Sequence, residues 1–104
     1  MKSLEVRVPH GLEQVEVRRR LDMAVDRARA DYGDKITELD ASWVGEERLQ
    51  VLLVVMGMKF NGEIEVLVEE LIVRLQVPGM AGLFSGKIRA GIQERLGGLL
   101  TASV

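Results

Sequence analysis

The 104-residue sequence contains no cysteine, a single histidine, two prolines and only 4% aromatic residues. The lack of cysteine excludes disulfide bonds, thiolate chemistry and cysteine-ligated metal sites. No apolar run approaches the roughly 18 residues that a membrane-spanning helix needs. The first residues lead into alternating charges rather than an apolar signal segment, so we expect a cytoplasmic protein.

The charge balance argues against nucleic acid as an obligate partner. The formal net charge is −2, whereas phosphate binding needs a clustered excess of positive charge. Three consecutive arginines, Arg18, Arg19 and Arg20, are an apparent exception. Their side chains fan around a predicted helix and acidic residues flank them, which favours a solvated surface over an anion site.

Four runs of alternating apolar and polar residues, 37–44, 48–55, 58–68 and 71–77, predict an antiparallel meander. The middle turn has two candidates, because Met56-Gly57 and Asn61-Gly62 both contain glycine. Asn-Gly is the stronger isolated hairpin signal. However, only reversal at Met56-Gly57 keeps the apolar residues of all four strands on one face. The predicted cross-strand pairs are Trp43 with Leu49, Ala41 with Val51, Leu39 with Leu53, Val55 with Met58, Leu53 with Phe60, Leu49 with Ile64, Val68 with Leu71, Val66 with Val73, Ile64 with Leu75 and Glu65 with Arg74.

Residues 4–8 alternate as a further strand, and two segments, 11–32 and 81–100, carry apolar residues at helical spacing. The second predicted helix contains an unusual number of glycines, each roughly 0.5–1 kcal/mol worse than alanine inside a helix. We therefore expect tertiary packing to hold this helix and its glycines to allow close approach of another backbone. These glycines are Gly82, Gly86, Gly91, Gly97 and Gly98.

Together these elements predict one α+β domain over residues 1–104. The predicted architecture has two layers: a five-stranded, mostly antiparallel sheet in the order β-α-β-β-β-β-α, with both helices packed on one face. The first strand is expected beside the last, giving the strand order 1-5-4-3-2.

No catalytic residue, metal ligand set or cofactor motif stands out, and we expect a protein that is not an enzyme. His10 lies where the first predicted helix begins. As a general base it would need a nucleophile or an orienting carboxylate, and the sequence marks neither. A structural role for His10 is therefore favoured.

Several short motifs resemble, in order and spacing, the polyhydroxyalkanoic acid system protein family. They are Val8-Pro9-His10-Gly11-Leu12, Trp43, Met56-Gly57-Met58-Lys59, Gly62-Glu63-Ile64-Glu65-Val66, Val73-Arg74-Leu75, Val77-Pro78, Phe84, Gly86-Lys87-Ile88 and Leu99-Leu100. The resemblance covers nearly the whole chain. It implies a link to the granules in which bacteria store polyester, and no known activity.

Two classes of function remain open. The first is a non-catalytic protein that acts through a surface, on a polyester granule, on a granule protein or on a second copy of itself. It rests on apolar residues of the otherwise polar sheet face, although scattered apolar surface residues are also normal. These interface candidates are Leu52, Val54, Leu67 and Ile72.

The second class is a module that binds an apolar ligand, such as an acyl chain or a hydroxyacid oligomer. A sheet that curves around a helix can enclose a cavity, although the same residues could simply fill a core. The candidate lining residues are Trp43, Val51, Leu53, Phe60, Phe84, Ile88 and Ile92.

Overall fold

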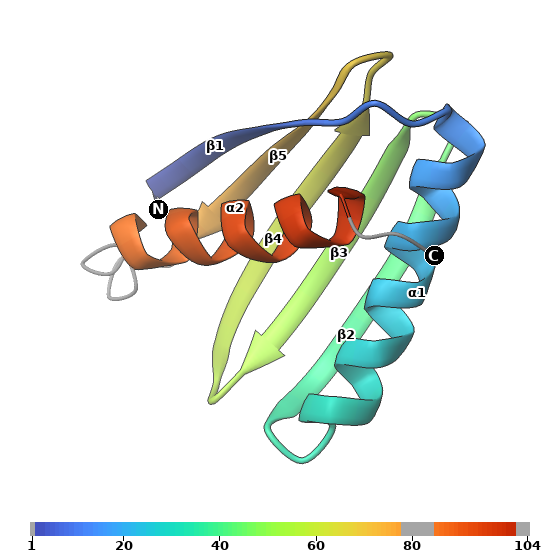
Figure 1. Cartoon of the computed structure of the whole chain (residues 1–104). Coiled ribbons are helices and arrows are strands. Elements are labelled where there is room, and N and C mark those ends of the chain that lie inside the picture. Colours follow the sequence, from blue (N-terminus) through green and yellow to red (C-terminus); the bar gives the residue numbers. More distant parts are fainter. Residues whose placement is uncertain (1, 78–84, 102–104) are drawn as a thin grey trace.

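The computed structural model describes residues 2–77 and 85–101 (Figure 1). Along the chain they form β1 (Lys2–Pro9), α1 (Gln14–Tyr32), β2 (Ile36–Val44), β3 (Arg48–Val55), β4 (Met58–Val66), β5 (Glu70–Val77) and α2 (Ser85–Thr101). The five strands form one antiparallel sheet in the order β1-β5-β4-β3-β2. The predicted α+β class, element order and strand order are confirmed.

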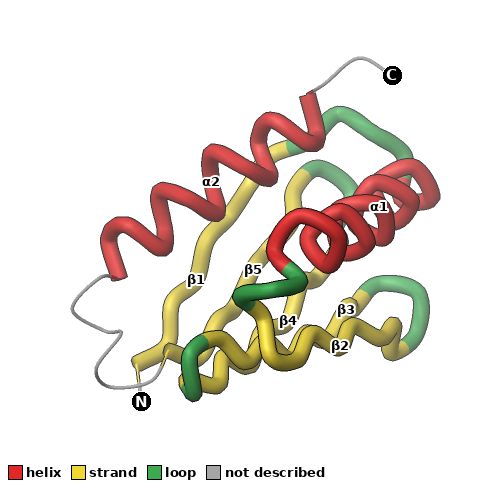
Figure 2. The backbone as a smooth tube through the Cα atoms, turned by 90° about the horizontal axis from the view of Figure 1, so that it is seen from below, coloured by secondary structure: helices red, strands yellow, loops and turns green. Residues whose placement is uncertain are grey.

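Both helices cover the same face of the sheet, here called the inner face (Figure 2). In Figure 1, α1 runs along β2, and α2 crosses the strands on the β1 side. The core residues alternate along the strands, as burial of one face requires. Buried residues of the main cluster include Val6, Val17, Leu21, Leu49 and Leu71.

The central hairpin reverses at Met56-Gly57, as predicted. Met56 has φ 52° and Gly57 has φ 76°, which is the left-handed conformation that two-residue hairpin turns need. Leu53 pairs with Phe60 across this turn. The competing Asn61-Gly62 pair lies inside β4, so cross-strand register outweighs the local turn signal.

The predicted register between β4 and β5 is wrong by two residues. Val66 pairs with Leu71, where Val68 was expected, and Val68 lies in the turn with 89% of its surface exposed. The Leu67 backbone N–H donates to the Glu70 carbonyl and closes this longer turn. A slip of two residues keeps every side chain on its face, so an alternating pattern cannot detect it.

The same slip alters the predicted pairing of Glu65 with Arg74. Glu65 lies opposite Ile72, and Glu63 lies opposite Arg74. The Glu65–Arg74 ion pair still forms, as a diagonal contact of 3.0 Å between Arg74 Nη1 and Glu65 Oε1.

The first helix begins at Gln14, three residues later than predicted. The Leu12 backbone N–H donates to His10 Nδ1 at 3.2 Å, and the Glu13 carbonyl accepts the first helical hydrogen bonds, from Glu16 and Val17. The His10 side chain thus bonds a backbone donor just before the helix.

The expectation that glycines of the second helix allow close backbone approach is wrong for the described ones. A Cβ placed on Gly86, Gly91, Gly97 or Gly98 would meet no atom within 4 Å. These glycines therefore face open space. Gly82 and the start of the predicted helix lie outside the described residues.

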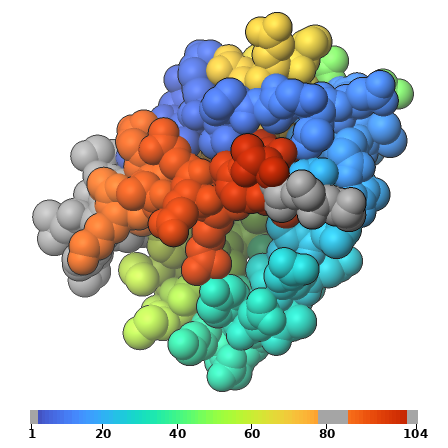
Figure 3. All heavy atoms as spheres, in the orientation of Figure 1, coloured from blue at the N-terminus to red at the C-terminus, as the bar shows by residue number. Residues whose placement is uncertain are grey.

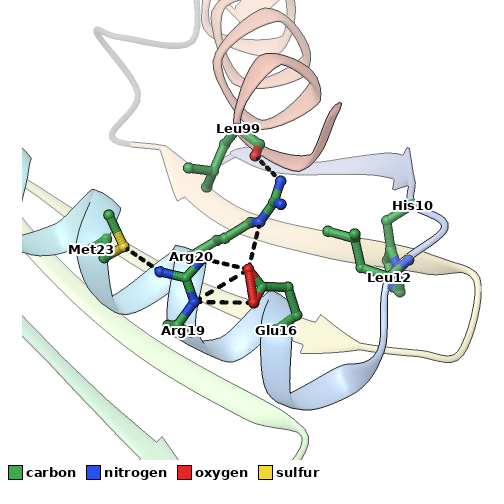
Figure 4. Close-up of polar contacts among 7 residues, drawn as sticks. All are labelled: His10, Leu12, Glu16, Arg19, Arg20, Met23 and Leu99. Atoms are coloured by element: carbon green, nitrogen blue, oxygen red, sulfur yellow. Dashed lines mark hydrogen bonds and ion pairs between the residues drawn. The ribbon is translucent and has the colours of Figure 1, made fainter. Parts of the chain in front are cut away.

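A buried arginine joins the two helices (Figure 4). Arg20 is only 8% exposed; its Nε donates to Glu16 Oε1 at 3.1 Å and its Nη1 to the Leu99 carbonyl at 2.9 Å. Arg19 also pairs with Glu16. The hydrogen bonds from Arg19 and Arg20 lower the pKa of Glu16 to about 2. This contact fixes the C-terminal end of α2 against α1.

We expect the stabilising effect of Glu16 to disappear in acid. Its folded-state pKa, about 2, lies below the ordinary value of 4.5, so its contribution is complete above pH 4.5 and is lost as the pH falls toward 2. Urea unfolding of wild type and Glu16→Gln should therefore differ at pH 7 and converge near pH 2. A difference that stays constant over this range would contradict the assignment.

Candidate functional site

An apolar groove of about 450 Å³ opens between α2 and the inner face of β3, β4 and β5, and Glu63 is the one charged residue in its described lining. Figure 3 shows a recess bounded by α2, the C-terminal half of α1 and the green strands β3 and β4. The groove is lined by Val51, Leu53, Val55, Met58, Phe60, Gly62, Glu63, Ile64, Val73, Leu75, Ile88 and Ile92.

The groove exists because the helices cover the inner face unevenly. At one end of the sheet, Leu49 and Leu71 are fully buried beneath side chains of both helices. Farther along β3, Val51, Leu53 and Val55 point to the same face but are only half-buried. The strands thus continue a core pattern beyond the area that the helices cover.

Gly62 deepens the floor of the groove. It pairs with Val51 on β3 and with Leu75 on β5, so the inner face has no side chain between these two residues. A Cβ at Gly62 would approach Leu75 Cδ1 to 3.3 Å. Glycine at this strand position therefore leaves space in the sheet centre.

The structure brings five of the seven predicted lining residues together in the groove: Val51, Leu53, Phe60, Ile88 and Ile92. The remaining described one, Trp43, lies elsewhere. Its Nε1 donates to Asp22 Oδ1 at 2.9 Å and Arg18 stacks 4.4 Å from its ring centroid, so Trp43 packs β2 against α1. Phe84 lies outside the described residues.

Several further residues line the groove that no sequence pattern marks as lining residues. They are Val55, Met58, Gly62, Glu63, Ile64, Val73 and Leu75. Alternation alone places the apolar side chains among them on the inner face. The missing information was which part of that face the second helix covers, and how β5 is aligned with β4.

On the opposite, outer face, Ile72 cannot serve as an exposed interface residue. It is only 5% exposed, because ion pairs between Arg7 and Glu70 (2.8 Å) and between Arg74 and Glu65 (3.0 Å) involve its immediate neighbours. The aliphatic stems of such long side chains readily cover apolar surface. The other interface candidates, Leu52, Val54 and Leu67, are half-buried, and a homodimer through this face stays a prediction.

The outer face also carries an open polar depression of about 730 Å³. Arg74 lies in it and pairs with Glu65 (3.0 Å), Glu5 (3.4 Å) and Glu63 (3.8 Å). The hydrogen bond that Arg74 donates to Glu65 contributes most to raising the pKa of Arg74. Because these exposed groups are already paired or solvated, this depression offers an apolar ligand less than the groove does.

His10 is held by the backbone on both sides. Its Nδ1 accepts the Leu12 N–H, so Nε2 carries the proton and donates to the Leu67 carbonyl at 2.9 Å. This arrangement links the start of α1 to the turn between β4 and β5. It corresponds to the structural role that the sequence favours.

Over residues 2–77 and 85–101, no cluster of three or more acidic or histidine side chains could hold a metal ion. Neither α1 nor α2 is long and apolar enough to cross a membrane.

The fold and the groove define a small two-layer α+β domain with an apolar recess beneath its second helix. Residues 4–100 match the family model described as "Putative polyhydroxyalkanoic acid system protein". The chain therefore belongs to the polyhydroxyalkanoic acid system protein family. No curated protein sequence matches it.

Two solved structures are distantly similar in fold. The crystal structure of Ara h 8.0201 is 10% identical with a TM-score of 0.41, over 97% of this chain and 99% of that one. The crystal structure of TTHA0849 from Thermus thermophilus is 13% identical with a TM-score of 0.36, over 95% and 92% of the two chains. Neither likeness bears on function.

Proposed function

We propose that this protein is a non-enzymatic member of the polyhydroxyalkanoate system that binds an acyl chain in its apolar groove. The observation that carries the proposal is the groove itself, about 450 Å³ in volume and lined by apolar surface. Sites for small ligands typically have volumes of ~300–1,000 Å³ and mostly apolar walls. The class of ligand follows from the name of the family, since polyhydroxyalkanoates are built from hydroxyacids.

Burial of hydrocarbon would drive this binding. Leu53, Phe60 and Ile88 are each half-buried in the free protein, so a bound alkyl chain would remove further apolar surface from water. Each methylene group buried is worth roughly 0.8 kcal/mol. The groove wall exposes no donor for an ester carbonyl, and an unpaired buried carbonyl costs about 1–3 kcal/mol. The alkyl part of a hydroxyacid should therefore enter the groove while its polar groups stay in water.

The same groove provides a route to granule association. A polyester with alkyl side chains presents the hydrocarbon that the groove would accept, and soluble hydroxyacids present it as well. The granule surface is then the proposed partner, and a cytoplasmic, granule-associated location follows. In this mode of association α2 remains packed on the sheet.

Affinity for 3-hydroxyacids should rise with chain length. Titration calorimetry with the six-, eight- and ten-carbon acids is expected to show about fourfold tighter binding per added methylene until the groove is full. Val51→Phe should weaken binding, because the larger ring would occupy the space left over Gly62 on the neighbouring strand. Phenylalanine opposite a strand glycine is also well tolerated in sheets.

Leu52→Phe is the matched control, since Leu52 is the next residue of β3 and faces the outer side. It should leave affinity unchanged. Affinity that does not depend on chain length, or that falls with Leu52→Phe and not with Val51→Phe, would contradict the groove as the site. The second result would instead favour the outer face.

A further inference from the structure

The residue that best fits the polar end of a ligand is Arg95, one turn beyond the groove on α2. Ile88 and Ile92 line the groove, and Arg95 follows Ile92 by three positions. Residues three apart in a helix share a side of it. Arg95 therefore lies on the same side of α2 as the two groove-lining isoleucines, although it does not itself line the groove.

Arg95 reaches from α2 to the last residue of α1. Its Nη1 donates to the Tyr32 hydroxyl at 3.1 Å, and its guanidinium carbon lies 5.7 Å from the Tyr32 ring centroid. The two helices diverge from the Arg20 contact toward this side, where the recess opens between them (Figures 1 and 3). The Arg95–Tyr32 contact thus spans the two helices that border the recess.

Arg95 has no ion-pair partner among the described residues, and its pKa is raised most by the hydrogen bond to Tyr32 and least by the charge of its neighbour Glu94. Within the described ranges its guanidinium bonds a neutral hydroxyl and forms no ion pair with a carboxylate. Six other arginines do pair with carboxylates: Arg7, Arg19, Arg20, Arg29, Arg48 and Arg74. A guanidinium has five N–H donors, and the Tyr32 hydroxyl takes one of them.

The charge distribution along α2 is a second observation that favours an anionic ligand. Its basic residues are Lys87, Arg89 and Arg95, and its one acidic residue is Glu94, although the whole chain has a net charge of −2. The helix that borders the groove is therefore positive on an acidic protein. Such a local field favours an anionic ligand.

From these observations we propose that the ligand is a free carboxylic acid, whose alkyl chain lies in the groove and whose carboxylate pairs with Arg95. This inference rests on the proposed function and narrows it to hydroxyacids with a free carboxylate, or to the free acid end of a polyester chain. A carboxylate matches the guanidinium in a bidentate pair, which a neutral hydroxyl cannot form. In the free protein the Tyr32 hydroxyl holds Arg95 toward α1.

The test compares decanoate with methyl decanoate, which have the same alkyl chain and differ in charge. Titration calorimetry should show that the wild type prefers the acid and that Arg95→Gln weakens acid binding about three- to fivefold, as expected for an ion pair at an exposed site. Binding of the ester should stay unchanged. Lys87→Gln is the matched control, because it removes an exposed positive charge from the same helix and should alter acid binding by less than about twofold. Unfolding midpoints of both variants verify that they remain folded.

Equal affinity of the wild type for acid and ester would overturn the carboxylate assignment and leave the apolar groove intact. Equal weakening of both ligands by Arg95→Gln would also overturn it, since Arg95 would then act only by holding α2 in place. Failure of both compounds to bind the wild type would instead overturn the proposed function, and this inference with it.

Discussion

Leu71→Ala is expected to lower the free energy of unfolding by about 2–5 kcal/mol. Leu71 is fully buried and pairs with Val8 on one side and Val66 on the other, in the centre of the main core. Removal of its side chain leaves a cavity between the sheet and the helices that neighbouring side chains cannot readily fill. Urea unfolding followed by circular dichroism measures the loss.

Leu53→Ala is the matched comparison, because it removes the same atoms from the groove instead of the core. Leu53 is half-buried, so its truncation should cost only about 1 kcal/mol. The same variant should weaken binding of a long-chain hydroxyacid. Leu71→Ala should not weaken it directly, because Leu71 does not line the groove. Equal destabilisation by both variants would show that Leu53 belongs to a closed core and that the groove is filled.

Replacing Gly91, Gly97 and Gly98 together by alanine is expected to raise the free energy of unfolding by roughly 1.5–3 kcal/mol. Each lies inside α2, and a Cβ at each would meet no atom within 4 Å. Alanine should therefore reduce the entropy of the unfolded chain without a steric penalty. Thermal unfolding should show a midpoint at least about 6 °C higher.

Gly57→Ala is the control of opposite sign. Gly57 has φ 76° in the central hairpin turn, where a Cβ is strained, so alanine should destabilise by about 1–2 kcal/mol although space is open around it. A triple α2 variant less stable than the wild type would contradict the conclusion that these three glycines face open space.

The sequence was sufficient for the element order and the central hairpin because alternation along each strand determines which residues share a face. The turn at Met56-Gly57 followed from the requirement that Leu53 and Phe60 share a face, and the structure confirms it. The β4–β5 alignment was missed because a shift by two residues preserves alternation. The turn between the two strands sets the alignment, and the hydrogen bond from the Leu67 N–H to the Glu70 carbonyl closes it.

The candidate site could be predicted only in part from the sequence. Alternation placed Val51 and Leu53 on the inner face, but it carried no information on how far α2 covers them. Trp43 shares the predicted apolar face and was therefore assigned to the groove, whereas its partner Asp22 comes from a helix twenty-one residues earlier. Arg20 was interpreted as one of three solvated arginines. Its contact with the Leu99 carbonyl joins residues seventy-nine positions apart, and no local pattern indicates such a contact.

The central claim, that the groove beneath α2 holds an acyl chain, is tested most directly by methyl NMR spectra recorded with saturating 3-hydroxydecanoate. We predict shifts of the methyl groups that line the groove, those of Val51, Leu53, Ile64, Ile88 and Ile92, and none at the buried core residues Leu21 and Leu71. Shifts confined to the outer-face residues Leu52 and Val54, or no shifts at all, would contradict the claim.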